Sequence, residues 1–262
     1  MSEDVITRWS AYKYDGRERS SFEDEIVLEY PFTVHLDGEE FATMVCTPTH
    51  VQDLIVGFLA SEGIIQSYGD IESLSIDKTA GFAYIELQNK RNVNKTMVSK
   101  RVIGSCCGKS RQFYFLNDAK TAKTIMTRNQ ISADQCIALM KQLQQSSEDF
   151  QKTGGLHNAA LSDASSLLVT RSDIGRHNAL DKIYGHTLQH SISMKDKIIV
   201  FSGRISSEVV LKVSKIGVGI LLSKSAPSNL ALELAEDLGI TTVGFIRDQR
   251  MNIYTHPERI VC

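Results

Sequence analysis

The sequence predicts an α/β protein, with a mixed sheet covered by helices and a smaller β-rich N-terminal portion. From about residue 166, short apolar runs alternate with helical patterns over short connections. Such alternation is typical of sheets that carry helices on their faces. Before residue 130, strand patterns and turn signals dominate. Of the 262 residues, 42% are hydrophobic, which is enough for one large or two small domains.

The N-terminal portion begins with a polar stretch. Residues 1–24 are rich in charged side chains, and we expect a frayed lead-in. The apolar and β-branched residues of 25–46 predict a hairpin that turns at Asp37-Gly38. We place the smaller β-rich portion at 25–130, with the cysteine loop 104–111 inside it, and the α/β domain at 131–262.

One helix is expected in the β-rich portion, over residues 49–62. Its apolar side chains recur at helical spacing, and Thr49 and Gln52 have the spacing of a capping box. Gly63 is a natural stop for this helix. A short strand is expected over 82–87.

The α/β domain begins with a second capping box, at Ser132 and Gln135, which predicts a helix. Met140 lies on the apolar face of that helix, where we expect it to fill core space. The strands predicted after it are 167–169, 197–201, 218–222 and 241–246, and the helices are 176–190, 206–216 and 228–238.

Two adjacent cysteines mark the most reactive stretch of the chain. Cys106 and Cys107 lie between glycines, with Arg101, Lys109 and Arg111 close in sequence. Nearby cations lower the pKa of a thiol and favour the reactive thiolate, so this segment is predicted to be a loop that presents thiols. The alternative is that the two cysteines are small buried hydrophobes.

Composition excludes several classes of protein. The formal net charge is −2, so no overall positive field attracts nucleic acid or an anionic membrane. No apolar run approaches about 20 residues, and the acidic N-terminus does not have the layout of a signal peptide. Five scattered cysteines form a poor disulfide framework and show no zinc-site spacing. We therefore expect a cytoplasmic protein without a bound metal.

Polar and basic residues gather in the loops that follow predicted strands. Ligands bind beyond the carboxyl ends of strands in such sheets, and helix N-termini suit phosphates. This pattern predicts a pocket for an anionic, nucleotide-like ligand. The candidate residues are His157, Arg176, His177, Arg204, Ser225, and the run Phe245, Ile246, Arg247, Asp248, Gln249 and Arg250.

Each of these residues also has a purely structural interpretation. A lone histidine is more often a hydrogen-bonded structural residue than a catalyst. Asp173 could cap a helix, and Asp181 and Lys182 could be solvated. The functional interpretation is favoured because at least four such loops could meet at one sheet edge.

Taken together, the motifs resemble the FdhD family, the sulfur-carrying accessory proteins of formate dehydrogenase. The matching stretches run in order through nearly the whole chain: TPTHVQDLIVGFLASEGII (47–65), GSCCGKSR (104–111), TGGLHNAAL (153–161), DIGRHNALDKIYG (173–185), SGRISSE (202–208), SKSAPSNLA (223–231) and GFIRDQRMNIYTHPERI (244–260). The resemblance implies that sulfur is accepted from a cysteine desulfurase as a cysteine persulfide. It further implies transfer to the molybdenum of bis-molybdopterin guanine dinucleotide, and a cytidine-deaminase-like fold.

Residue by residue, Cys107 before Gly108 matches the persulfide cysteine of the family best, and Cys106 is a secondary candidate. Many members have two cysteines separated by two residues, whereas Gly104 stands three positions before Cys107 here. Residues 245–250 match the segment that is thought to hold the cofactor. In that segment Arg247 and Arg250 would pair with phosphates.

Three alternatives stay open from the sequence. A zinc-dependent nucleobase deaminase needs His-x-Glu followed by Pro-Cys-x-x-Cys, but His157 is followed by Asn158-Ala159. A non-catalytic cofactor-binding chaperone and a redox sensor are the others. A homodimer is also possible, because Gly217 and Gly219 could mark either close packing in the sheet or a subunit contact.

Overall fold

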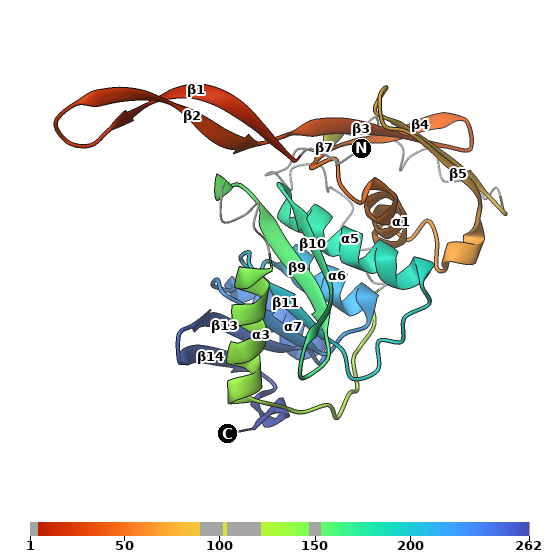
Figure 1. Ribbon diagram of the computed structural model, residues 1–262. Helices are drawn as coiled ribbons and strands as arrows, with labels where there is room; N and C mark the ends of the chain where they lie inside the picture. The colour runs from red at the N-terminus through yellow and green to blue at the C-terminus, as the bar shows by residue number, and fades with distance from the viewer. Residues whose placement is uncertain (1–4, 90–101, 104–121, 147–152, 262) are drawn as a thin grey trace.

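The computed structural model describes residues 5–89, 102–103, 122–146 and 153–261. A six-stranded sheet lies at the centre of the C-terminal half, in the order β10-β9-β11-β12-β13-β14 (Figure 1). Strands β11, β12 and β13 are parallel, and β9, β10 and β14 run antiparallel to their neighbours. Their bounds are β9 His157–Ser162, β10 Leu167–Asp173, β11 Ile198–Phe201, β12 Ile220–Ser223, β13 Thr241–Arg247 and β14 Arg250–Thr255.

Helices cover both faces of this sheet, so its central strands are apolar on both sides. Alternate residues of β11 enter different cores: Ile198 packs with helix α3 (Ala133–Gln145), whereas Ile199 faces the opposite side. That side carries α5 (Arg176–Gln189), α6 (Ser207–Ile216) and α7 (Asn229–Asp237). The period of two residues explains why these strands appear as continuous apolar runs in the sequence.

A second sheet of five strands forms the β-rich N-terminal portion, in the order β5-β6-β3-β4-β7. Helix α1 (Val51–Ser61) packs between this sheet and α5, and one continuous core joins them (Figure 1). The strands are β3 Tyr30–Leu36, β4 Glu39–Cys46, β5 Ile71–Asp77, β6 Phe82–Leu87 and β7 Val102–Ile103. A two-stranded parallel sheet pairs β8 (Ile131–Ser132) with β15 (Ile260–Val261), and two short 3₁₀ turns span Tyr68–Asp70 and Pro257–Arg259.

The predicted mixed sheet with covering helices and the β-rich N-terminal portion are both confirmed. Strands β3 and β4 form the expected hairpin, with Asp37 and Gly38 at positive φ in its turn. The capping box of Ser132 and Gln135 is present at the start of α3, and Met140 is buried. The division into 25–130 and 131–262 stays a prediction.

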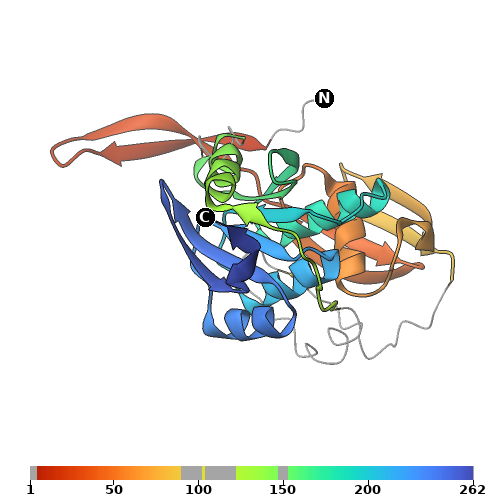
Figure 2. The same ribbon diagram turned by 90° about the horizontal axis from the view of Figure 1, so that it is seen from below.

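The N-terminal lead-in differs from the expectation. Residues 6–24 are not frayed, because strands β1 (Ile6–Tyr14) and β2 (Arg19–Val27) pair in an antiparallel ribbon. This ribbon, which we call the N-terminal arm, projects from the body of the molecule in both views (Figures 1 and 2). The sequence pattern did not predict this arm, because few of the residues in the arm are aliphatic and its β-forming residues are dispersed among charged ones.

Two further expectations are wrong. The capping box at Thr49 is absent, since α1 starts after His50, which takes a left-handed conformation without a side-chain cap. Asp181 and Lys182 are not solvated: Lys182 is fully buried and Asp181 is 3% exposed. Sequence spacing alone could not show the charged partners that these two side chains find on other elements.

The glycines Gly217 and Gly219 pack within the chain. A side chain at Gly219 would lie 2.4 Å from the Thr127 methyl group, and one at Gly217 would approach Lys123. Residues 122–130 therefore run closely over this part of the sheet. Close packing therefore accounts for Gly219, whereas Gly217 ends α6 at a φ of 96°, a left-handed conformation that favours glycine.

Candidate functional site at the carboxyl edge of the central sheet

Several of the predicted site residues meet at one edge of the six-stranded sheet. The parallel strands β11, β12 and β13 lead into Ser202, Lys224 and the β13–β14 turn. Because β9 is antiparallel to β11, its first residue, His157, lies at the same edge, where it pairs with Asp173 at the end of β10. The expected convergence of strand-end loops is thus present in the structure.

Short hydrogen bonds fix the loops at this edge. The backbone amide of Asn158 donates to the Ser202 hydroxyl at 2.9 Å, and the Asn158 side-chain oxygen accepts from Ser172 at 2.7 Å. The Ser225 hydroxyl donates to the Ser202 carbonyl at 3.1 Å. The Ser223 hydroxyl donates to the Gly203 carbonyl at 2.8 Å. These loops are therefore preorganised, which lowers the cost of ordering them around a ligand.

Two pockets open at this edge, on either side of the C-terminal half of α3. The first has a volume of about 270 Å³ and includes Gly155, His157, Ser202 and Lys224 in its lining. The second has a volume of about 490 Å³ and is lined by Ile246–Gln249 together with residues of α3. Met140 and Gln144 line both pockets. Helix α3 thus forms a wall that is shared by the first pocket, which contains His157 and Lys224, and the second pocket, which contains Arg247.

The charge of this edge favours an anion. Burial lowers the pKa of His157, and the nearby Arg176 cation lowers it further against the opposing effect of Asp173. His157 is therefore a neutral imidazole at pH 7, able to donate or accept one hydrogen bond. Lys224 adds a cation to the first pocket, and Arg247 adds one to the second.

The β13–β14 turn presents its polar residues to solvent. Phe245 and Asp248 take positive φ values of 53° and 51°. The ladder register shifts between Gly244 and Arg247, which twists the hairpin away from the regular sheet. Ile246 is buried against α3, whereas Arg247, Asp248, Gln249 and Arg250 are exposed. The Arg247 guanidinium lies 5.9 Å from the centroid of the Phe245 ring.

The remaining candidates lie near this edge without lining the two pockets described above. His177 Nε2 is 2.8 Å from the Glu208 carboxylate, so this histidine joins α5 to α6. Arg204 is exposed on the loop after β11. Arg176 begins α5, and its buried Nε has no hydrogen-bond partner among the described residues. The sequence prediction missed Lys224, Asn158 and Gln144. The position of Lys224 directly after a strand was the available signal.

Both cysteines that the structure describes are unsuited to thiol chemistry. Burial is the main cause that raises the pKa of Cys46 to about 12, and it also raises that of Cys136 to about 12. Neither therefore forms a thiolate at neutral pH. The predicted persulfide residues Cys106 and Cys107 lie outside the described residues. The chain enters their segment at β7, which pairs with β4 beside Met44.

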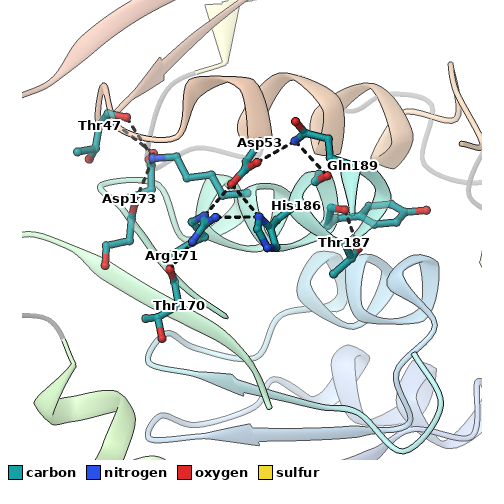
Figure 3. A network of polar contacts seen from close by, with 12 residues as sticks. Thr47, Asp53, Thr170, Arg171, Asp173, His186, Thr187 and Gln189 are labelled. Atoms are coloured by element: carbon teal, nitrogen blue, oxygen red, sulfur yellow. Dashed lines mark hydrogen bonds and ion pairs between the residues drawn. The ribbon is translucent and has the colours of Figure 1, made fainter. Parts of the chain in front are cut away.

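A buried ionic network connects β4 and α1 to the elements that build the edge (Figure 3). Asp173 accepts from the Thr47 amide at 3.1 Å and forms a 2.7 Å ion pair with Lys182. Asp53 of α1 accepts from Arg171 at 2.7 Å and from Gln189 at 2.8 Å. Because both acids bridge separate parts of the chain, the N-terminal sheet is held in a fixed position beside the edge.

No group of three or more His, Cys, Asp or Glu side chains that could hold a metal ion occurs among the described residues. No helix in the described part of the chain is long and apolar enough to cross a membrane.

A family model described as the FdhD/NarQ family matches residues 27–261. The chain belongs to this family. It is 61% identical over 261 residues to the sulfur carrier protein FdhD of Geobacillus kaustophilus, covering 100% of this chain and 99% of the relative. It is 54% identical over 260 residues to the sulfur carrier protein FdhD of Bacillus subtilis, covering 99% of each chain.

A solved structure shows the same fold. It is the crystal structure of a protein from Desulfotalea psychrophila described as a candidate formate dehydrogenase accessory protein, with a TM-score of 0.82. The match covers 98% of this chain and 100% of the other at 22% sequence identity. The arrangement of both sheets is thus one that a distant sequence also adopts.

Proposed function

We propose that this FdhD/NarQ family member is a sulfur carrier for formate dehydrogenase. It accepts sulfur from a cysteine desulfurase as a persulfide on Cys107 and passes it to bis-molybdopterin guanine dinucleotide, its substrate. The observation that carries the proposal is the full-length similarity to relatives named sulfur carrier protein FdhD. It is supported by the gathering of basic and polar residues at one sheet edge.

The loading step needs a reactive thiolate. The Cys107 thiolate attacks the outer sulfur of the desulfurase persulfide, the S–S bond breaks, and the desulfurase leaves as a thiolate. Arg101, Lys109 and Arg111 stand close in sequence and would favour the thiolate. Cys46 and Cys136 are excluded from this role by their burial and raised pKa values.

In this proposal, the cofactor that accepts the sulfur binds in the two pockets beside α3. A bis-guanine dinucleotide carries two separate pyrophosphate groups, and the two pockets have separate cations in Lys224 and Arg247. Pocket volumes of about 270 and 490 Å³ suit parts of such a ligand. His157 and Ser202 would supply neutral hydrogen bonds, and Arg247 could bind a phosphate through two parallel N–H donors.

Loading is tested by the mass of the intact protein after incubation with a cysteine desulfurase and cysteine. A reductant-sensitive gain of one sulfur should occur on the wild type and on Cys106→Ser, and it should disappear with Cys107→Ser. Loading on both single variants would instead assign the sulfur to either thiol. A wild type that gains no sulfur would contradict the proposal and favour a non-catalytic chaperone.

The acceptor pocket is tested separately with GDP as the probe. Lys224→Gln should weaken GDP binding about tenfold, as expected for one charge-assisted hydrogen bond. Lys195→Gln is the matched control, because Lys195 is an exposed lysine just before β11, at the opposite edge of the sheet. If Lys224→Gln and the wild type bind GDP with equal affinity, Lys224 is not part of the binding site.

A further inference from the structure

Residues 123–130, which we call the strap, run extended beside the six-stranded sheet (yellow-green in Figure 1). Their side chains alternate between two faces. Ile125 and Thr127 pack over Gly219, which directly precedes β12, whereas Met126 is 93% exposed. A repeat of two residues is that of a β-strand. The strap therefore has the form of a strand, although it pairs with no strand in the described part of the chain.

One side of the strap is bound to the body of the protein. The Lys123 amide donates to the Ser214 hydroxyl of α6 at 2.8 Å. The Ile125 amide donates to the carbonyl of Leu238, just after α7, also at 2.8 Å. Successive N–H groups of an extended chain point to opposite sides. The amides of the residues between and after these two therefore point away from α6 and α7.

The other side of the strap is open. Among the described residues, the backbone amides of Thr124, Met126 and Arg128 have no hydrogen-bond partner. These three residues are two positions apart, so their N–H groups point to the same side at intervals of about 7 Å. A row of unpaired backbone amides is a free strand edge, and such an edge is a template for pairing with another chain.

A groove of about 930 Å³ runs along the strap. Its opposite wall is the loop 194–197, directly before β11, and Ile216 and Gly219 contribute to its lining. Neither Ser214 nor Leu238, which bind the inner amides, lines this groove. The groove therefore lies on the open side of the strap, beside the free amides.

The lining of the groove is basic. It contains Lys123, Arg128, Lys195 and Lys197 against one acid, Asp196. The ammonium groups of Lys123 and Lys197 donate to backbone carbonyls. Arg128 and Lys195 are exposed, and no ion pair joins either of them to a carboxylate of the residues that the structure describes. These two cations are therefore available to an acidic ligand.

We propose that this groove binds an extended acidic segment of a partner protein, which adds as a strand to the open edge of the strap. Pairing with the free amides needs acceptors at a two-residue repeat, which a peptide backbone supplies and a single small anion does not. The net charge of −2 disfavours nucleic acid. In the bound segment, acidic side chains face Arg128 and Lys195, and apolar side chains on the other face pack against Met194 and Ile216.

The position of the groove leaves the candidate ligand site open. The loop 194–197 precedes β11, whereas Ser202, in the lining of the first pocket, follows it. The groove and the two pockets beside α3 therefore lie at opposite edges of the sheet. A partner bound along the strap does not cover those pockets.

Fluorescence anisotropy with the full chain tests the proposal, and the probe is the fluorescein-labelled peptide Glu-Val-Glu-Leu-Glu-Val-Glu. The wild type should bind it saturably, and Arg128→Gln/Lys195→Gln should weaken binding about tenfold, as expected for the loss of two exposed ion pairs. The matched control is Arg17→Gln/Lys78→Gln, which removes two exposed cations from the β1–β2 and β5–β6 turns and should bind like the wild type. The absence of saturable binding at millimolar peptide, or an equal loss in both double variants, would overturn the proposal.

N-methylation of the peptide tests strand pairing. One probe is methylated on the backbone nitrogens of its apolar residues and another on those of its internal glutamates. Because alternate amides of a strand point to opposite sides, only one of the two probes should lose binding, and equal binding or equal loss would contradict strand addition.

The other occupants are tested with the same variants. Tighter binding of an oligothymidylate that depends on Arg128 and Lys195 would assign the groove to nucleic acid instead. A lower sedimentation coefficient of Arg128→Gln/Lys195→Gln than of the wild type would assign it to a second copy of this chain. Either result would overturn the proposal, whereas binding of the acidic peptide without these effects supports it.

Discussion

Replacing Gly185 with alanine should separate helices α1 and α5. These helices cross where Gly57 and Gly185 face each other, and no side chain lies between their backbones. A Cβ atom at Gly185 would lie 1.9 Å from the Asp53 carbonyl oxygen and 2.7 Å from the Gly57 amide nitrogen. Both contacts involve backbone atoms, so no flexible side chain can move away from the new methyl group.

The expected magnitude follows from two opposing effects. Alanine in the middle of a helix is favoured over glycine by about 1 kcal/mol through helix propensity. Overpacking a close contact costs about 1–3 kcal/mol, and more when backbones must shift. Ordinary contact distance is reached only when the helices move apart by well over 1 Å, which also stretches the 2.7 Å Asp53–Arg171 ion pair. Because the contacts are with backbone atoms, the cost lies at the upper end of that range, and we expect a net loss of about 2 kcal/mol.

Urea unfolding followed by circular dichroism measures this effect as a lower midpoint at an unchanged slope. Gly69→Ala is the control, because the nearest atom to a Cβ at Gly69 is a side-chain oxygen at 3.6 Å. This control should change stability by less than about 0.5 kcal/mol. A Gly185→Ala protein that is more stable than the wild type would show that propensity dominates and that the helices do not approach this closely.

Three other predictions follow from the buried groups. Burial lowers the pKa of His186 from its ordinary 6.5. Stability present above pH 6.5 should therefore fall as the pH drops from 6.5 toward the lowered folded-state pKa, and His186→Gln should flatten this decline in thermal midpoints measured at several pH values. Asp173→Ala should cost about 3–5 kcal/mol in urea unfolding because it leaves Lys182 buried without its carboxylate. Asp173→Ala/Lys182→Met should recover part of that loss, and no recovery would contradict the pairing. Iodoacetamide at pH 8 should leave Cys46 and Cys136 unmodified in the native protein, whereas modification before unfolding would contradict their raised pKa values.

Local patterns predicted much of the secondary structure. The β3–β4 hairpin follows from alternating apolar residues around Asp37-Gly38, and α3 begins at its capping box with Ser132. These elements were readable because each depends on residues within a few positions of one another. The gathering of His157 and Ser202 at one edge was also predictable, since the carboxyl ends of parallel strands share a side.

Other features required contacts between distant residues. Thr49 has capping-box spacing, but the chain before α1 contacts Asp173 through Thr47, and the helix starts later without that cap. Lys182 has the sequence setting of a solvated residue, yet it is buried against Asp173, which is nine positions away and on another element. The division of the candidate site into two pockets depends on α3, whose side chains give no sign in the sequence of lying beside both.

The sequence by itself determined the fold class, the order of most strands and helices and the family resemblance, and it predicted a reactive cysteine pair. These properties follow from the periodicity of apolar residues and from the order of the motifs, and both can be recognised without knowing how the chain packs. Tertiary structure alone decided the burial of Asp181 and Lys182, the glycine crossing of α1 and α5, and the shape of the arm. The physical reason is that burial and close approach depend on which surfaces meet, and residues far apart in the chain supply those surfaces.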